Sequence, residues 1–367
     1  MGILSRLFGK GAPASSAEDP AAGPLLVNAY ATVRELPPLD FPHAFNSGRD
    51  LSDPELHPHL QGFTGYVMAR GDGQMTGARY HLWRHIQRVH NQVSFAVLEA
   101  ALPAVEAWAR SANSVLFLPD GSVRAPDMAV LMTADGAFGS DAQLPYPPDA
   151  LARRGRTLER LNGADPQPPV GMPPALGEAE VALRSASEVA RRALALVRVA
   201  ARAAEIASEG AAAIPEASGI EASASDGFTL TERSFLEADV PDDQLVAETA
   251  WRFEAANVLL WALDAEGADI ARADARADPD TLLRAALALA ADGPTPAAAR
   301  LRPAAEILDA LDLAWRQHWI VRQARQKGFV PDGIDPDVIG ERHYALNWLT
   351  GFHNDPGTDW DDTDTPT

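Results

Sequence analysis

The chain has 367 residues, a net charge of −20 at pH 7 and no cysteine. The acidity argues against binding to nucleic acid or to an anionic membrane surface, because both interactions need a basic protein surface. The lack of cysteine excludes disulfides, thiolate nucleophiles and every metal site built on cysteine. The length is sufficient for two ordinary domains.

Residues 1–24 are predicted to be a flexible leader. The segment 11–24 (GAPASSAEDPAAGP) consists mostly of small residues and proline, which have little to bury. The apolar stretch in 1–10 is too short and too interrupted for a secretory signal, and no run in the chain reaches the ~18 apolar residues of a membrane span. We therefore expect a cytoplasmic protein.

Residues 25–163 are predicted to form a mixed domain of strands and helices. Apolar residues recur at helical spacing in 78–90 and 98–111. The segment 92–97 between them can be strand or helix, because it is too short for its period to discriminate. Apolar runs of strand length predict strands at 25–33, 63–70, 114–118 and 122–132. We expect a small sheet with helices packed on one side.

Residues 164–177 are predicted to be a linker, because they include five prolines and two glycines. Residues 178–367 follow as a mainly helical domain, so the predicted fold class is α+β. Thr229 and Glu232 have the spacing of a capping box at the start of one helix. Further helices are predicted at 178–209, 244–263, 282–291, 302–327 and 337–349.

Tryptophan-centred motifs recur along the helical domain in a fixed order. They are WRFEA and LLWAL within 251–263, EILDALDL and HW within 306–319, ERHYALNWL at 341–349 and WDDTDT at 360–365. Together they resemble the bacterial family named domain of unknown function 4272, over residues 229–365 and with the helix from 178 in the same unit. The resemblance implies a tryptophan-rich helical fold unit. It implies no established activity, and therefore no catalytic role for any residue.

Charged and imidazole side chains lie among these tryptophans and form the candidate site. Carboxylates and imidazoles that project from several helices can build a metal site, and Glu306 with Asp309 could present two oxygens to one cation. The alternative is a structural network, because buried charges need partners, and Asp312 with Arg316 has the spacing of a helical ion pair. We favour the network. The candidate residues are Glu254, Glu306, Asp309, Asp312, His318, Glu341, Arg342 and His343.

Three other patterns are interpreted as structural. The first domain has two histidines at i,i+4 but no acidic ligand placed to complete a zinc site. The loop 71–77 has the glycines of a dinucleotide fingerprint without their spacing. The acidic tail lacks the glycine and glutamate of a calcium loop, and Trp360 within it is expected to dock onto the helices. The residues concerned are His43, His57, His59, His81, His85 and His90, and Asp355, Asp359, Asp361, Asp362 and Asp364.

The sequence contains no recognisable nucleophile motif and no cofactor loop, so neither a cofactor nor a metal is predicted. We favour a non-enzymatic interaction or scaffold protein. A narrower form of this hypothesis is an immunity protein that neutralises a basic toxin, because the acidic charge would speed association with a basic partner. The alternative is a metal-dependent hydrolase that uses the carboxylates and histidines of the helical domain.

Overall fold

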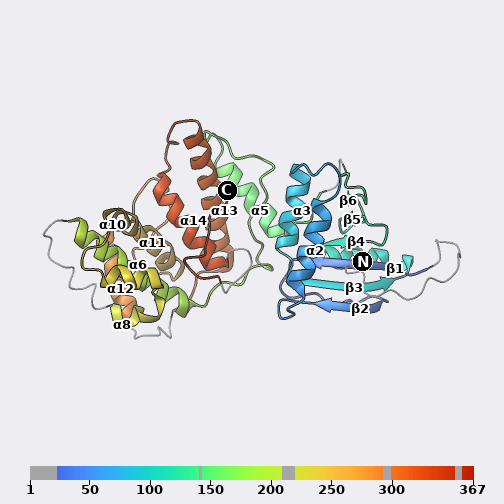
Figure 1. The fold of residues 1–367 in the computed structure, drawn as a ribbon, viewed down its shortest axis with the longest axis horizontal. Helices are drawn as coiled ribbons and strands as arrows, with labels where there is room; N and C mark the ends of the chain where they lie inside the picture. The colour runs from blue at the N-terminus through green and yellow to red at the C-terminus, as the bar shows by residue number, and fades with distance from the viewer. Residues whose placement is uncertain (1–22, 140–142, 209–219, 292–298, 352–357) are drawn as a thin grey trace. The chain divides into compact units, whose positions relative to one another are not determined.

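The computed structural model describes residues 23–139, 143–208, 220–291, 299–351 and 358–367 (Figure 1). The chain divides into two compact units, Met1–Asp149 and Ala150–Thr367. The first contains an antiparallel sheet with helices and the second is mainly helical, which confirms the predicted α+β class. Of the predicted leader only the last two residues are described, and the proline-rich segment 164–177 lies within the second unit.

A six-stranded antiparallel sheet forms the centre of the first unit. Its strands are β1 (Leu25–Ala31), β2 (Ala44–Arg49), β3 (Asn91–Val97), β4 (Ser114–Phe117), β5 (Val123–Arg124) and β6 (Val130–Met132). The strand order is β2-β3-β1-β4-β5-β6, so β1 pairs with both β3 and β4. The strands predicted at 25–33 and 114–118 are confirmed, the undecided segment 92–97 is a strand, and 122–132 contains two short strands. No prediction covers β2, because its sequence AFNSGR lacks apolar alternation and it is mostly exposed.

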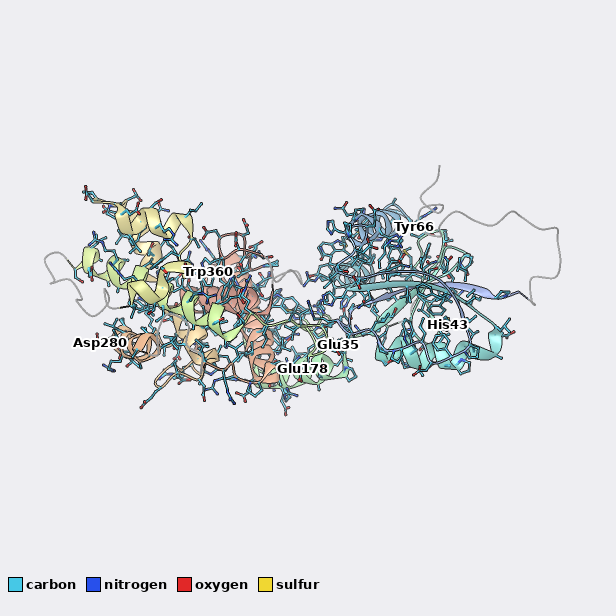
Figure 2. The ribbon with its side chains drawn as sticks, turned by 90° about the horizontal axis from the view of Figure 1, so that it is seen from below. Glu35, His43, Tyr66, Glu178, Asp280 and Trp360 are labelled. Carbon is cyan, nitrogen blue, oxygen red and sulfur yellow. The ribbon has the colours of Figure 1, made fainter. Side chains whose placement is uncertain are left out.

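Helices cover both faces of this sheet, so the prediction of helices on one side is wrong. They are α2 (Leu56–Met68), α3 (Gly77–Gln87) and α4 (Leu102–Ser111), the last preceded by a 3-10 turn (Glu99–Ala101). Tyr30 of β1 lies in one cluster with Tyr66 of α2 and Leu82 of α3, and Figure 2 shows Tyr66 on that side of the sheet. Ala29, the residue before Tyr30 in β1, lies in a second cluster with Trp108 of α4. Successive strand residues point to opposite faces, and the central strand is buried on both, so each face needs a cover.

The segment 63–70, predicted as a strand, is instead helical over residues 63–68, the C-terminal part of α2. Its buried residues Phe63, Tyr66 and Val67 recur at three and four positions, which is the helical period. The apolar run is too short for this period to exclude a strand, and the helix begins upstream at Leu56, in a segment with little apolar character. The glycine-rich loop 71–77 therefore follows a helix, which removes the strand context of a dinucleotide fingerprint.

The second unit is built from helices. They are α5 (Pro148–Arg160), α6 (Ala186–Ala207), α8 (Glu221–Ala224), α9 (Leu230–Glu237), α10 (Asp243–Ala250), α11 (Arg252–Ala262), α12 (Pro279–Ala291), α13 (Ala304–Gln326) and α14 (Pro336–Thr350). The capping box predicted at Thr229 and Glu232 is confirmed at the start of α9. Among the described helices, none has the length and apolar character to cross a membrane.

Most of the predicted helices agree with the structure to within three residues at each end, but those predicted at 178–209 and 244–263 differ more. The helix predicted from residue 178 begins at Ala186, because Ser185 and Glu188 form a capping box that fixes its start. The helix predicted at 244–263 is divided into α10 and α11 at Trp251, which ends the first and begins the second. The division turns the face of α11 relative to α10, so that nearly all of α11 is buried.

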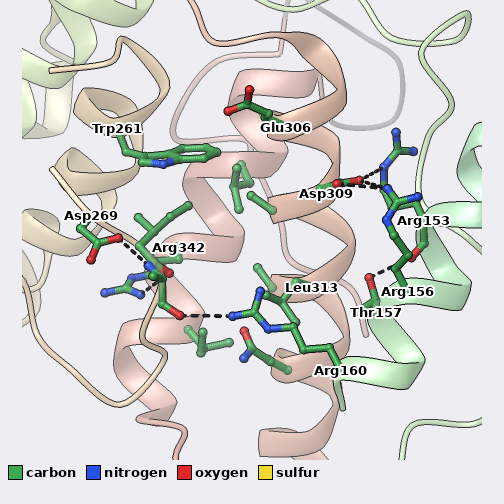
Figure 3. Close-up of a pocket in the computed structure, with 17 residues that line it drawn as sticks. Arg153, Arg156, Thr157, Arg160, Trp261, Asp269, Glu306, Asp309, Leu313 and Arg342 are labelled. Atoms are coloured by element: carbon green, nitrogen blue, oxygen red, sulfur yellow. Dashed lines mark hydrogen bonds and ion pairs between the residues drawn. The ribbon is translucent and has the colours of Figure 1, made fainter. Parts of the chain in front are cut away.

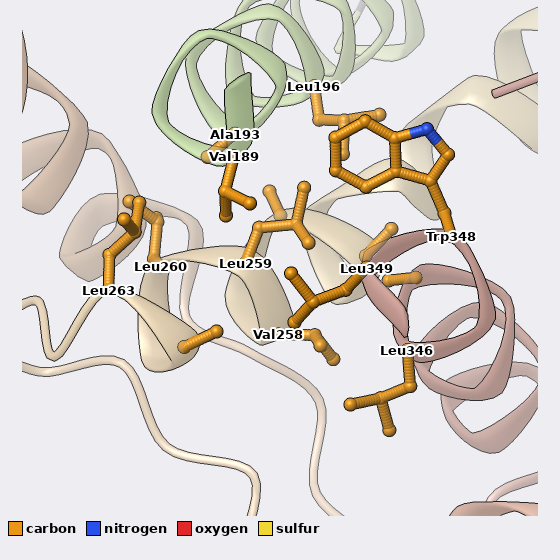
Figure 4. Packing of buried hydrophobic residues seen from close by; sticks show 14 of the residues in the cluster. Val189, Ala193, Leu196, Val258, Leu259, Leu260, Leu263, Leu346, Trp348 and Leu349 are labelled. Carbon is orange, nitrogen blue, oxygen red and sulfur yellow. The ribbon is translucent and has the colours of Figure 1, made fainter. Parts of the chain in front are cut away.

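The main core of the second unit lies where α6, α11 and α14 pack together (Figure 4). Ala193 of α6, Leu259 of α11 and Leu349 of α14 are fully buried within it. The small alanine side chains of α6 let the helices approach closely, and burial of the apolar surface supplies the main stabilisation of the unit. The polar residues of the candidate site lie on α11, α13 and α14, so this core positions them.

The acidic tail docks onto the helices through Trp360, as predicted. The Trp360 ring is buried between Trp348 and Tyr344, with their ring centroids at 5.4 and 5.0 Å, and the guanidinium of Arg192 lies 4.2 Å from its centroid. Further along the tail, the indole Nε1 of Trp315 donates to the Pro366 carbonyl oxygen at 2.9 Å. The tail thus closes one side of the helical unit. Asp355 lies outside the described residues.

Candidate functional site

The eight residues of the predicted polar set do not converge on one point. They separate into pairs, most of them formed with an arginine, at different places on α11, α13 and α14. Among the residues that the structure describes, no group of three or more histidine, aspartate or glutamate side chains could hold a metal ion. The pairs are therefore considered one at a time.

Glu254 and Arg342 form a buried ion pair between α11 and α14. Glu254 Oε2 accepts from Arg342 Nε at 3.2 Å and from Nη2 at 3.0 Å, and both side chains are almost fully buried. Arg342 also donates to the carbonyl oxygens of Ile270, Arg272 and Ala275. The other oxygen of Glu254 accepts from the Ala277 backbone N–H. The pair therefore fixes the loop between α11 and α12, because it supplies hydrogen-bond partners to buried backbone groups of that loop.

Asp312 and Arg316 form a second buried pair, one turn apart on α13, as their spacing predicts. Both side chains have zero exposure, and the two Asp312 oxygens accept from Arg316 Nε and Nη2 at 3.0 Å each. Asp312 also accepts from the Ala175 backbone N–H at 3.2 Å, and Arg316 donates to the Pro173 carbonyl oxygen at 2.9 Å. This pair therefore anchors the proline-rich segment to α13.

Glu341 of α14 pairs with Arg252 of α11. Both Glu341 oxygens accept from Arg252 Nη1 at 2.9 Å. Burial raises the pKa of Glu341 above its ordinary value, and the charge of Arg252 opposes this rise. The sequence analysis identified Glu341 but not its partner, because the two residues are far apart in the chain.

His318 of α13 and His343 of α14 face each other, with 2.9 Å between their Nδ1 atoms. One imidazole must donate and the other accept, so at least one of the two Nδ1 atoms carries no proton. Burial lowers the pKa of His318 to about 4, with a smaller contribution from the charge of Arg322. Burial also lowers the pKa of His343 well below its ordinary value, and His318 lowers it further. The pair is therefore neutral at pH 7.

These depressed pKa values predict a loss of stability in mild acid. An unfolded histidine titrates near pH 6.5, whereas the folded pair stays neutral until a much lower pH. The unfolded chain then binds more protons, so the free energy of unfolding is at its full value above about pH 6.5 and falls as the pH falls towards about 4. Urea unfolding at about pH 7 and about pH 4.5 should show a smaller decrease for His343→Asn than for the wild type. An equal decrease in the two proteins would contradict the assignment.

Asp309 and Glu306, one turn apart on α13, face a pocket of about 420 Å³ (Figure 3). Asp309 accepts from Arg153 Nε and from Arg156 Nη2, each at 2.8 Å. Glu306 is half exposed, with Arg302 at 3.3 Å. Both carboxylates are thus paired, but with arginine side chains from different parts of the chain.

The arginines of α5 that line this pocket are not among the residues predicted from the sequence. Arg153, Arg156 and Arg160 follow one another at three and four residues, so they lie on one face of the helix. Figure 3 shows Arg153 and Arg156 on the side of the pocket opposite Trp261 and Arg342, while Arg160 reaches from α5 towards the loop at 269–271. The helical spacing of these arginines is visible in the sequence. The same spacing is typical of an ordinary solvent-exposed helix face, so it does not by itself indicate a pocket.

A second concavity, here called the α13–α14 groove, has a volume of about 730 Å³. It lies beside the turn that connects the two helices, where Phe329 and Val330 are exposed. Arginines and carboxylates are mixed around these apolar side chains. The charged residues that line the groove are Arg252, Arg322, Arg325, Glu248, Asp337 and Glu341.

Three histidines of the first unit have separate partners. His81 Nδ1 lies 2.5 Å from the Tyr146 hydroxyl, while His85 Nε2 lies 3.0 Å from the Tyr30 carbonyl oxygen. His59 Nε2 lies 3.0 Å from the hydroxyl of the same Tyr30. Burial lowers the pKa of His59 and of His85 to about 4. The i,i+4 pair therefore has no common ligand position, and its structural interpretation agrees with these contacts.

The glycine-rich loop 71–77 is filled by an arginine. Arg79 donates to the carbonyl oxygens of Arg70 and Gln74 at 2.7 Å each. A phosphate cradle would need free backbone N–H groups facing an open space, and here a cationic side chain occupies the loop.

The sequence was compared with known protein families, with curated proteins and with solved structures. A family model with the description "Domain of unknown function (DUF4272)" matches residues 153–363. The match begins within α5, so it includes the α5 arginines and the proline-rich segment as well as the tryptophan motifs. Neither the curated proteins nor the solved structures gave a match to the chain.

Proposed function

Because the chain belongs to the DUF4272 family, whose description names no activity, we propose its function from the geometry of the family's own segment. The proposed function is that of a non-enzymatic interaction protein, which acts in the cytoplasm and binds a protein partner through its helical unit. The absence of cysteine agrees with a reducing compartment. The observation that supports the proposal most strongly is the pairing of the buried charged groups.

Glu254 and Asp312 are each buried against an arginine, and the half-buried Glu341 also pairs with one. A carboxylate that is paired with a guanidinium has its charge balanced and most of its acceptor positions used, which disfavours a role as metal ligand or general base. The alternative function, a metal-dependent hydrolase, needs groups in the site that can take these roles. Geometry therefore favours a structural role for these pairs, and the function is then expected at the surface of the unit.

The α13–α14 groove is the surface that a partner would use. Val330 is 68% exposed and Phe329 is exposed beside it, and apolar side chains within a rim of charges are typical of protein-binding sites. The net charge of −20 would speed association with a basic partner, as in the immunity-type form of the proposal.

An affinity experiment on the full chain tests this surface. Val330→Asp should abolish recovery of the partner, because it places a charge in the apolar centre of the contact. Val240→Asp is the matched control, since Val240 is also exposed (91%) but lies outside the groove. Each variant is expressed at native level, cross-linked in the producing cell and purified. A protein recovered with the wild type and with Val240→Asp, but not with Val330→Asp, supports the proposal. Recovery of the same proteins with both variants would refute it.

A further inference from the structure

The pocket beside α5 has the composition of a small-molecule site. It lies entirely within the second unit, between α5, α13, α14 and the loop at 269–271, and it shares no residue with the α13–α14 groove. Its apolar surface comes from Leu313, Ala314 and Leu346. A volume of about 420 Å³ is within the range of pockets that enclose small ligands.

One polar side chain of this pocket has an amide that is available to a ligand. Gln317 is 9% exposed, and among the described residues its amide has no hydrogen-bond partner, yet its atoms are not fully buried. It lies one turn after Leu313 on the α13 face that lines the pocket. A ligand in the pocket could therefore exchange hydrogen bonds with this amide in place of water.

The arginines of α5 give one side of the pocket an excess of positive charge, while the carboxylates of Asp269 and Glu306 line other parts of it. Arg156 shares the single carboxylate of Asp309 with Arg153. Arg160 is exposed and donates one hydrogen bond, to the Ala271 carbonyl oxygen at 3.3 Å. No carboxylate of the described part of the chain lies within ion-pair distance of Arg160. This side of the pocket therefore carries unneutralised positive charge, in a protein whose net charge is strongly negative.

The opposite side of the pocket presents an aromatic ring. Trp261 is half-buried and lines the pocket, and Figure 3 shows its indole extending over it, across from the arginines of α5. Flat apolar groups pack favourably against indole rings. The pocket thus combines arginine side chains, an aromatic surface and an amide that can donate and accept hydrogen bonds.

We propose that this pocket binds a small organic anion with a flat apolar body. The anionic group pairs with Arg160 and Arg156, the body packs against Trp261 and Leu313, and the Gln317 amide hydrogen-bonds to the ligand. This site is independent of the partner surface proposed above, since the two are lined by different residues.

The proposal is tested with 8-anilinonaphthalene-1-sulfonate, a flat aromatic anion, and with N-phenyl-1-naphthylamine, which has the same rings without the sulfonate. Fluorescence titration and calorimetry of the full chain should show one site for the anion. Arg160→Gln should weaken its binding by about tenfold or more, because a hydrogen bond to a charged group is worth about 1.5–3 kcal/mol. Gln317→Met, which keeps the side-chain volume, should also weaken it. Arg154→Gln, on the same helix but outside the pocket, is the matched control.

The neutral probe separates an anion site from an apolar surface. N-phenyl-1-naphthylamine should bind more weakly than the anion to the wild type, and Arg160→Gln should leave its affinity unchanged. Equal effects of Arg160→Gln and Arg154→Gln on the anion would overturn the proposal, as would equal wild-type affinities for the two probes. If Gln317→Met binds the anion as tightly as the wild type does, the anion does not contact Gln317, and this result would also overturn the proposal. A urea titration of each variant verifies that the fold is retained.

Discussion

Replacing Asp312 with asparagine should lower the free energy of unfolding of the helical unit by about 3–5 kcal/mol. The substitution removes the negative charge but almost none of the volume, and it leaves the Arg316 guanidinium buried without a counter-charge. It also weakens the contact with the Ala175 backbone N–H, which ties the proline-rich segment to α13. Urea unfolding followed by tryptophan fluorescence measures the change, since most of the tryptophans lie in this unit.

Two further variants show whether the effect is due to the broken pair. Asp280→Asn makes the same chemical change at an exposed position in the first turn of α12, and should change the free energy by no more than about 1 kcal/mol. The double replacement of Asp312 by leucine and Arg316 by methionine should recover much of the loss, because an apolar pair avoids the desolvation cost of two charges. If Asp312→Asn is no more destabilising than Asp280→Asn, the pair is not a stabilising element.

Replacing Glu254 with glutamine should release the loop between α11 and α12. Arg342 then loses its charged partner, so the ion pair no longer orients its guanidinium. In that orientation the guanidinium donates to the carbonyl oxygens of Ile270, Arg272 and Ala275. The Ala277 backbone N–H also loses a charged acceptor. Hydrogen exchange of residues 269–277 should therefore accelerate by about tenfold or more, which corresponds to at least about 1.4 kcal/mol of local stability.

Amides of α6 in the same protein serve as the internal control for this experiment. Amides in the middle of α6, far along the chain and outside the loop, should exchange at rates that reflect only the global change in stability. Unchanged exchange in residues 269–277 would contradict the role assigned to Glu254.

The local features of the helical unit could be predicted from the sequence because their causes are local. The capping box of Thr229 and Glu232 and the ion pair of Asp312 and Arg316 each depend on residues three or four positions apart. The docking of Trp360 followed from the cost of exposing an indole. Each of these rules needs only the identities of neighbouring residues or the chemistry of one side chain.

The partners of the candidate residues could not be predicted, because they come from distant parts of the chain. Arg252 neutralises Glu341, and Arg153 reaches Asp309 from a helix that the sequence analysis had assigned to the first domain. Pairing at such separations depends on the packing of whole helices, which apolar periodicity does not specify. For the same reason the pocket could not be predicted, since its charged side and its aromatic side lie more than a hundred residues apart in the sequence.

The central claim is that the buried polar set of the helical unit stabilises the fold and performs no chemistry. The most direct test compares the free energies of unfolding of Glu254→Gln and Glu306→Gln, which make the same change at a buried and at a half-exposed carboxylate. We expect Glu254→Gln to lose about 3–5 kcal/mol and Glu306→Gln about 1 kcal/mol or less. Glu254→Gln with unchanged or increased stability would contradict the claim, because a residue kept at a cost to stability is typical of a functional site.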